Sequence, residues 1–133
     1  MAYSDADANS LIIVGAGGCG MMAALVAAAK GVSVLLLEKT DKPGGSTAFS
    51  SRGIRASGSR FQGTLGIDDS PEQYARDIFG RNSNESDVPL TKRLTEVSGV
   101  VADFLADVAC IDFSVGEFVF GHSARRPHSW KED

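Results

Sequence analysis

A cluster of glycines near the N-terminus is the part of the sequence best suited to bind a charged ligand. The segment Gly15-Ala16-Gly17-Gly18-Cys19-Gly20 matches the pattern G-x-G-x-x-G. In this pattern the first glycine allows a tight turn, the second lets the backbone approach a pyrophosphate, and the third lets a helix pack closely against a strand. The first amide groups of that helix, at the positive end of its dipole, would then face the phosphates. The spacing therefore predicts a site for a dinucleotide phosphate.

The segments on either side of this turn have the order that such a site requires. The apolar run Leu11-Ile12-Ile13-Val14 predicts a buried parallel strand, and residues 21–30, rich in Ala, Leu and Met, predict a helix that ends at Gly31. Residues 33–38 predict a second buried strand, which completes a βαβ unit. Glu38 ends that strand 18 residues after Gly20, where a carboxylate can accept hydrogen bonds from an adenosine ribose. The alternatives are a glycine turn that serves packing alone and a Glu38 that is only solvated.

A second glycine cluster helps to choose between nucleotide cofactors, because a ribose carboxylate alone does not separate NAD from FAD. Gly44-Gly45 follows Glu38 by six residues and leads into Ser46-Thr47 and then Ser50-Ser51-Arg52-Gly53-Ile54. A glycine pair lets main-chain N–H groups point at a ligand, and the hydroxyls behind it can reach phosphate, ribitol or ring heteroatoms. This arrangement suits a long, extended cofactor such as FAD. An NAD(P)-binding Rossmann domain and a non-catalytic nucleotide-binding fragment stay open as alternatives.

Length and composition set the limits of the remaining possibilities. The chain has 133 residues, 43% apolar and 23% charged, with a formal net charge of −4, as expected of one globular domain and not of a nucleic-acid binder. Two cysteines do not make a disulfide framework. The leader contains Asp5 and Asp7 but no Lys or Arg, and the glycines at 15–20 would break a spanning helix. We therefore expect no membrane segment, no metal site and a cytoplasmic location.

The rest of the chain, from residue 40 onward, predicts a long loop followed by two helices. Residues 40–66 form a polar stretch rich in Gly, Ser and Arg. The first helix opens at Ser70-Pro71, with Gln73 completing a capping box. The second opens near Asp87 and repeats apolar residues every three to four positions, which predicts one buried face: Leu90, Leu94, Val97, Val101, Phe104, Leu105 and Val108. A short strand is expected within residues 111–120.

These motifs together resemble the FAD-binding domain of the fumarate reductase and succinate dehydrogenase flavoproteins. The likeness is closer to the soluble branch, which includes soluble fumarate reductases and 3-ketosteroid dehydrogenases. It covers residues 11–129 and rests on the pattern formed by residues 14–20, 37–39, 44–47 and 51–54, in which the first two motifs are specific only when taken together. Residues 66–72 and 121–128 add support. The resemblance implies an α/β fold, a partial Rossmann-like FAD-binding domain in which a βαβ unit is followed by a cofactor loop and two helices.

The resemblance also implies residue roles. The glycines of the first cluster would turn around the FAD pyrophosphate, Glu38 would bind the ribose with Lys39 beside the adenine, and the later residues would line the path to the isoalloxazine ring. The implied cofactor-binding set is Gly15, Ala16, Gly17, Gly18, Gly20, Glu38, Lys39, Gly44, Gly45, Ser46, Thr47, Ser51, Arg52 and Gly53. Ser46 stands where membrane succinate dehydrogenases carry the histidine that bonds to FAD, so the resemblance implies non-covalent FAD. Arg52 stands where many relatives have glycine.

The implied activity is hydride transfer to or from an alkene conjugated to a carboxylate or ketone. In this family the substrate-binding and proton-donating groups lie in a capping domain and a C-terminal FAD segment, so no catalytic residue is assigned here. We expect residues 1–10 to be disordered and residues 11–133 to be the N-terminal portion of the FAD-binding domain, poorly soluble and weak in FAD binding when expressed alone. A small-molecule substrate would bind through the missing domains. His122, Arg125, Arg126 and His128 are interpreted as a solvated loop or an edge of the flavin pocket.

Overall fold

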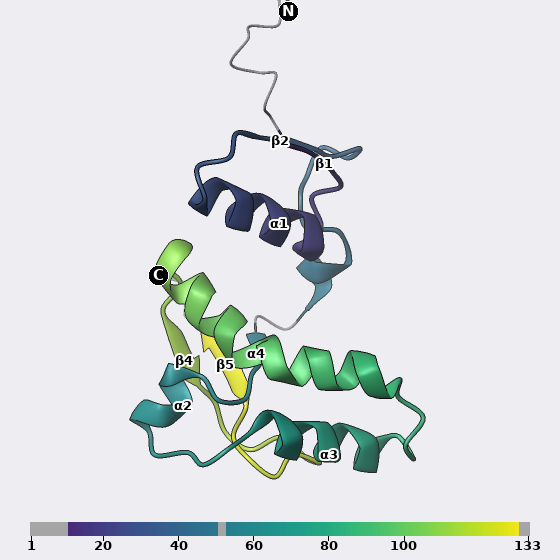
Figure 1. The fold of residues 1–133 in the computed structure, drawn as a ribbon, viewed down its shortest axis with the longest axis vertical. Coiled ribbons are helices and arrows are strands. Elements are labelled where there is room, and N and C mark those ends of the chain that lie inside the picture. The colour runs from purple at the N-terminus through teal and green to yellow at the C-terminus, as the bar shows by residue number, and fades with distance from the viewer. Residues whose placement is uncertain (1–10, 51–52, 131–133) are drawn as a thin grey trace, which may run out of the picture. The chain divides into compact units, whose positions relative to one another are not determined.

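The computed structural model describes residues 11–50 and 53–130 and divides the chain into two compact units, Met1–Ser51 and Arg52–Asp133. Both units mix helices with short strands (Figure 1). Among the described residues, no helix is both long enough and apolar enough to cross a bilayer.

The first unit is a βαβ unit followed by a short helix. Strand β1 (Leu11–Val14), helix α1 (Gly18–Ala29) and strand β2 (Val34–Leu37) come in the predicted order, and the 3-10 helix η2 (Gly45–Phe49) follows. The two strands are parallel, with Leu11 opposite Val34 and Val14 opposite Leu37. The predicted βαβ unit and the α/β class are therefore confirmed. Helix α1 begins three residues earlier than expected, so the last glycines of the turn form its first turn.

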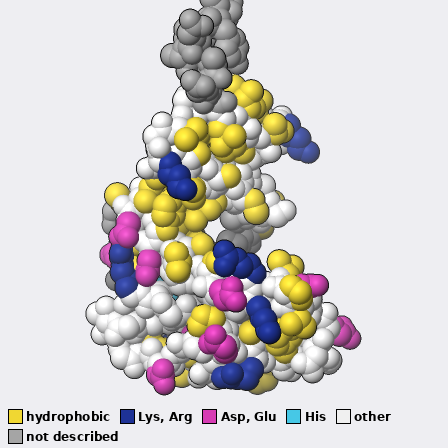
Figure 2. Space-filling view, viewed as in Figure 1, with side chains coloured by type: hydrophobic (Ala, Val, Ile, Leu, Met, Phe, Trp, Pro, Cys, Tyr) yellow, Lys and Arg dark blue, Asp and Glu magenta, His cyan; other side chains and the backbone are white. Residues whose placement is uncertain are grey.

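The strands of this unit are not buried on both faces, contrary to the sequence prediction. Val14 is 83% exposed and Ile12 55% exposed, and α1 contains no buried residue. Apolar side chains accordingly gather on the visible surface of this unit (Figure 2). The physical reason is that the sheet formed by the described residues of this unit has two strands, which is too few for strands to be enclosed by neighbours.

The second unit combines an antiparallel sheet with three helices. Its elements are β3 (Gly53–Arg55), α2 (Arg60–Thr64), α3 (Pro71–Arg81), α4 (Val88–Val108), β4 (Phe113–Val115) and β5 (Pro127–Trp130). Strand β5 lies between β3 and β4 and is antiparallel to both. The long loop predicted over residues 40–66 is wrong, because η2, β3 and α2 lie within it. Helix α2 begins with a capping box between Ser59 and Gln62, a sequence pattern that was overlooked.

The two predicted helices of this unit are present, with caps that differ in one detail. The Ser70 hydroxyl accepts a hydrogen bond from the Gln73 backbone N–H at 3.2 Å, as a cap should. The reciprocal half of the predicted capping box is missing, because the Gln73 side-chain amide donates instead to the Ser123 hydroxyl at 2.8 Å. Asp87 caps α4 by accepting from the Leu90 N–H at 2.8 Å.

The buried face of α4 is not the apolar face that the sequence predicted. Leu90 is 67% exposed and Leu94 48% exposed, whereas the buried residues of this helix are small or polar: Thr91, Thr95, Ser98, Gly99 and Ala102. The cause is a close approach of α4 to the chain after β3, since a Cβ on Gly99 would lie 2.4 Å from the Ser57 carbonyl oxygen. Large side chains cannot fit there, so α4 packs against this segment through its face of small and polar residues.

Candidate cofactor-binding site

The first glycine cluster lies at the carboxyl ends of the two parallel strands, which is where open α/β sheets bind ligands. Gly15 adopts a φ of +100° and donates its N–H to the Leu37 carbonyl at 2.7 Å, which holds the turn against β2. A Cβ on Gly20 would lie 1.8 Å from the Gly15 carbonyl oxygen, so only glycine allows α1 to come this close. A Cβ on Gly17 would meet no atom within 4 Å. The turn is therefore closed on its packing side and open at Gly17.

The first turn of α1 offers amide groups at this open side. The first hydrogen bond within the helix runs from the Met21 N–H to the Gly17 carbonyl at 2.9 Å. The Gly18 N–H donates to the Thr47 hydroxyl at 3.1 Å. Within residues 11–50 and 53–130, the N–H groups of Cys19 and Gly20 have no acceptor. These two donors, at the positive end of the helix dipole, suit an anion such as a diphosphate.

The second glycine cluster lies directly against the first. The Gly44 N–H donates to the Ala16 carbonyl at 2.8 Å, and Gly17 and Gly44 form a parallel bridge. Gly44 and Gly45 both have positive φ, at +125° and +51°, a conformation that favours glycine. Gly45, Ser46 and Thr47 begin η2 and are exposed. The sequence predicted both clusters as cofactor loops, and the structure adds the contact between them.

Glu38 follows β2 and ties its carboxylate to both neighbouring segments. One oxygen, Oε2, accepts from the Ala16 N–H at 2.8 Å, and Oε1 accepts from the backbone N–H and the hydroxyl of Thr40, both at 3.0 Å. The hydrogen bonds from the Ala16 and Thr40 backbones lower the pKa of Glu38, so the group is an ionised acceptor at neutral pH. A carboxylate oxygen has more than one lone-pair direction, so Glu38 can accept further bonds from ligand hydroxyls.

The other described residues of the predicted cofactor-binding set are not part of the contact between the two glycine clusters. Lys39 is exposed after β2. Gly53 begins β3 in the second unit, where a Cβ would lie 3.0 Å from both the His128 carbonyl oxygen and the Ser129 hydroxyl. Ser51 and Arg52 lie outside the described residues. Thr40 was not among the residues predicted from the sequence, although a hydroxyl two residues after the predicted ribose carboxylate is placed to orient it.

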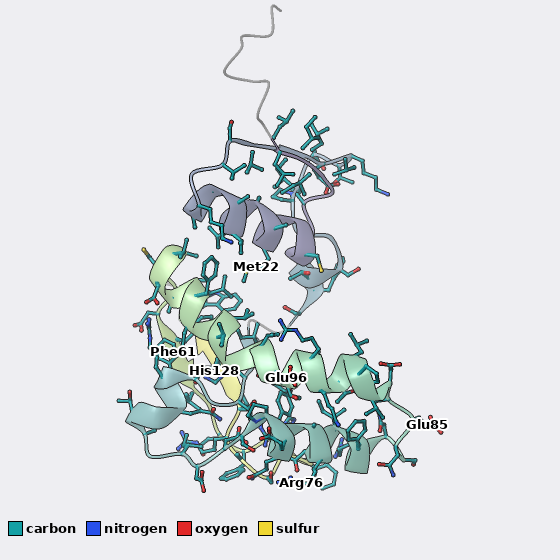
Figure 3. The ribbon with its side chains drawn as sticks, viewed as in Figure 1. Met22, Phe61, Arg76, Glu85, Glu96 and His128 are labelled. Carbon is teal, nitrogen blue, oxygen red and sulfur yellow. The ribbon has the colours of Figure 1, made fainter. Side chains whose placement is uncertain are left out.

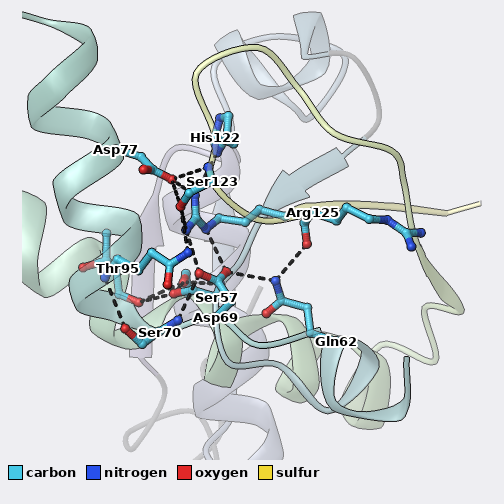
Figure 4. A network of polar contacts seen from close by, with 12 residues as sticks. Ser57, Gln62, Asp69, Ser70, Asp77, Thr95, His122, Ser123 and Arg125 are labelled. Atoms are coloured by element: carbon cyan, nitrogen blue, oxygen red, sulfur yellow. Dashed lines mark hydrogen bonds and ion pairs between the residues drawn. The ribbon is translucent and has the colours of Figure 1, made fainter. Parts of the chain in front are cut away.

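A buried ionic cluster holds the second unit together, and it overturns the interpretation of Arg126 as part of a solvated loop (Figure 4). The Arg126 side chain is fully buried and donates to both oxygens of Asp69, at 2.6 and 2.7 Å. It also pairs with Asp77, and its guanidinium lies 4.5 Å from the centre of the Tyr74 ring. Burial opposes ionisation of Asp77, but hydrogen bonds from Ser123 and Arg126 prevail and lower its pKa.

His128 is likewise buried and not solvated. Its Nδ1 lies 2.7 Å from the Arg126 carbonyl oxygen, which can only accept, so Nδ1 carries the proton. Nε2, 2.6 Å from the Ser59 hydroxyl, then accepts from it. Burial lowers the pKa of His128, which favours this neutral form. The rings of Phe61 and Phe113 pack edge-on against the imidazole, and Figure 3 shows Phe61 beside it. Arg126 and His128 thus both make contacts that stabilise the second unit.

Comparison with known proteins identifies the chain. Residues 10–130 match a family model described as the FAD binding domain. The chain belongs to this family. Its α/β architecture is therefore that of an FAD-binding domain.

Individual relatives of this FAD-binding domain include reductases and dehydrogenases. The chain is 36% identical over 97 residues to an NADH:fumarate oxidoreductase of Klebsiella pneumoniae, covering 73% of this chain and 10% of the relative. It is 30% identical over 128 residues to a fumarate reductase (cytochrome) of Shewanella frigidimarina, covering 96% of this chain and 22% of the relative. It is 38% identical over 78 residues to a 3-oxosteroid 1-dehydrogenase of Rhodococcus opacus, covering 56% and 15% respectively.

Solved structures agree with this assignment of fold. The open conformation of a flavocytochrome c3 fumarate reductase superposes with a TM-score of 0.78 at 27% identity, covering 90% of this chain and 21% of the other. The 3-ketosteroid-Δ4-(5α)-dehydrogenase of Rhodococcus jostii RHA1 gives a TM-score of 0.66 at 29% identity, covering 80% and 22%. The FAD-binding domain described here thus spans between a tenth and about a fifth of the length of these relatives.

Proposed function

We propose that this chain binds FAD non-covalently, with the diphosphate over Gly17 and the adenosine ribose at Glu38. The observation that carries the proposal is the contact between the two glycine clusters at Ala16 and Gly44, beside the Glu38 carboxylate. In this proposal the Cys19 and Gly20 amides donate to the phosphates, while Glu38 accepts from the ribose hydroxyls. Gly45, Ser46 and Thr47 continue the path away from the diphosphate.

The residues present fit the chemistry of this cofactor. The open space at Gly17 is where a Cβ would block the approach of a phosphate to the backbone. The N–H donors at the helix N-terminus match the negatively charged diphosphate of FAD. The ionised Glu38 carboxylate matches the ribose hydroxyls. The remaining members of the predicted set, Lys39, Ser51, Arg52 and Gly53, are proposed to follow the adenine and the flavin ring.

We further propose that the chain is the N-terminal portion of an FAD-dependent oxidoreductase that acts on C–C bonds. FAD, when bound, supplies hydride exchange with an alkene next to a carboxylate or ketone. The named activities of the relatives support this class, because they include fumarate and urocanate reductases and 3-oxosteroid 1-dehydrogenases. This chain's own residues bind and orient the cofactor, and the groups that hold the substrate belong to regions beyond those matched here.

A comparison of cofactors tests the binding proposal. Titration of the 133-residue chain with FAD, followed by flavin fluorescence, should saturate, whereas NAD⁺ should compete only weakly. Glu38→Gln should weaken FAD binding by about tenfold, since it loses a charged acceptor at the ribose. Glu85→Gln, an exposed carboxylate in the second unit, is the matched control and should leave the affinity unchanged. Tighter binding of NAD⁺ than of FAD would overturn the proposal in favour of a nicotinamide-binding domain.

Two further measurements test whether FAD is bound non-covalently and whether the chain alone can turn over a substrate. Acid precipitation of the FAD-loaded chain should release all the flavin into the supernatant, because Ser46 offers no histidine nitrogen for a covalent bond. Flavin retained in the pellet would refute non-covalent binding. The FAD-loaded chain, supplied with an electron donor, should not reduce fumarate. Turnover by the chain alone would show that it holds the substrate-binding groups itself.

A further inference from the structure

One concavity is lined only by residues of the second unit. It has a volume of about 330 Å³ and is bordered by β3, α3 and the segment around residue 121. Its lining includes several groups that carry a positive charge or can donate a hydrogen bond. The residues are Arg55, Tyr74, Asp77, Ile78, Arg81, Asn82, Gly121 and His122.

Two of these groups are cations without an ion-pair partner. Within the part of the chain that the structure describes, neither Arg55 nor Arg81 has a carboxylate at salt-bridge distance. The Arg81 guanidinium is held in place by stacking 4.6 Å from the centre of the Phe120 ring. Asp77 is the carboxylate of the lining, but its Oδ2 already accepts from Arg126 and from the backbone and hydroxyl of Ser123. The concavity therefore keeps a positive excess.

His122 adds a neutral donor whose tautomer is fixed by its neighbour. Arg126 Nη1 lies 3.2 Å from His122 Nδ1. A guanidinium can only donate, so Nδ1 accepts, and the neutral ring carries its proton on Nε2. Burial lowers the pKa of His122, and the positive charges of Arg126 and Arg55 lower it further, so the neutral form is favoured at pH 7. Among the described residues, this Nε2–H has no acceptor.

Tyr74 adds a hydroxyl of the same kind. The residue is 6% exposed, and burial raises the pKa of its phenol, so it stays protonated. No acceptor for this hydroxyl lies among residues 11–50 and 53–130. Two guanidinium groups, an imidazole N–H and a phenol O–H thus line one small concavity. Among the residues that the structure describes, each still has a hydrogen bond to donate.

We propose that this concavity binds a small organic carboxylate. A planar guanidinium donates two parallel hydrogen bonds to a carboxylate, and the His122 and Tyr74 donors can take the remaining lone pairs. The inference rests on the second unit alone and does not depend on FAD binding by the glycine clusters. A chain that fails to bind FAD can still bind a carboxylate here, and the reverse holds as well.

The test is an NMR titration of the 133-residue chain with succinate at constant ionic strength. The backbone amides of residues 119–123 should shift and saturate. Arg55→Gln and Arg81→Gln should each weaken binding by about five- to tenfold, as expected for loss of one charge-assisted contact. Arg93→Gln removes an exposed arginine outside the concavity, with a side chain 72% exposed, and should change the affinity less than twofold.

Other probes decide the chemistry of the ligand. Succinamide, which has the same carbon skeleton without charge, should not bind, and inorganic phosphate should bind more weakly than succinate. Equal shifts with succinamide, or an equal loss of affinity in Arg93→Gln, would overturn the proposed site. Tighter binding of phosphate than of succinate would overturn the assignment to a carboxylate. Using two separate arginine variants guards against a local loss of structure when Arg81 no longer stacks on Phe120.

Discussion

The substitution Gly20→Ala tests the packing of the glycine turn against α1. The added Cβ would lie 1.8 Å from the Gly15 carbonyl oxygen and 3.0 Å from its carbonyl carbon, and Cβ contacts essentially never fall below 3.0 Å. Both atoms belong to the backbone, so no side-chain rotation relieves the clash. The helix and the turn must separate by about 1.2 Å, which costs about 1–3 kcal/mol for overpacking alone.

That movement also strains the contacts that depend on the turn. The Gly44 N–H to Ala16 carbonyl bond, at 2.8 Å, and the Gly18 N–H to Thr47 hydroxyl bond, at 3.1 Å, join the glycine turn and the start of α1 to residues 44–47. Losing one of them adds about 0.5–1.5 kcal/mol. We therefore expect Gly20→Ala to lower the free energy of opening of the first unit by about 1.5–4.5 kcal/mol.

Hydrogen exchange of the α1 amides measures this change where it occurs. The matched control is Gly80→Ala in α3, where a Cβ would meet no atom within 4 Å. That control should stabilise α3 by about 0.5–1 kcal/mol, the helix-propensity gain of alanine over glycine. Exchange from α1 that stays within about 0.5 kcal/mol of the wild-type value in Gly20→Ala would refute the close approach of helix and turn.

Three further predictions concern the polar contacts. Arg126→Leu leaves the buried Asp69 carboxylate without its counter-charge, although Gln62 and Ser70 still donate hydrogen bonds to it, and should cost about 3–5 kcal/mol in urea unfolding. Arg93→Leu should stay within about 0.5 kcal/mol of the wild type, and equal effects of the two substitutions would contradict the buried cluster. Thr47→Val removes the hydroxyl that accepts from the Gly18 N–H and should destabilise α1 by about 1 kcal/mol, measured by hydrogen exchange. Thr47→Ser keeps the hydroxyl and should stay near the wild type. Equal stability of the two variants would exclude a capping role for Thr47. Burial lowers the pKa of His128 in the folded chain, so on acidification the unfolded chain binds a proton at this residue at a higher pH than the folded chain does. The stability of the second unit should therefore fall as the pH drops below about 6.5, and a stability that is flat between pH 7 and 5 would contradict this.

The sequence was informative where local chemistry dictates structure. The glycine spacing and the two apolar runs predicted the βαβ unit, because each glycine has a backbone requirement that no other residue meets. Ser70 and Asp87 likewise predicted the starts of α3 and α4 through their side-chain caps. These features depend on neighbours within a few positions in the chain, so a single sequence contains them.

The errors arose where partners are distant in sequence. Apolar periodicity predicted Leu90 and Leu94 as core, but α4 packs through Gly99 against the Ser57 backbone, 42 positions earlier in the numbering. Arg126 was interpreted as a loop cation because its partner Asp69 lies 57 residues away. Asp77 and Tyr74 share one face of α3 three residues apart, a spacing that could have suggested a buried cation opposite them.

The central claim is that the backbone at Gly17 is where this chain receives the diphosphate of FAD, and one pair of titrations tests it directly. Gly17 has a φ of −76°, which alanine also adopts, and a Cβ there meets no protein atom within 4 Å. Gly17→Ala should therefore leave hydrogen exchange of α1 unchanged while weakening FAD binding by at least about tenfold. Equal FAD affinity in the variant and the wild type, with both folded, would contradict the account.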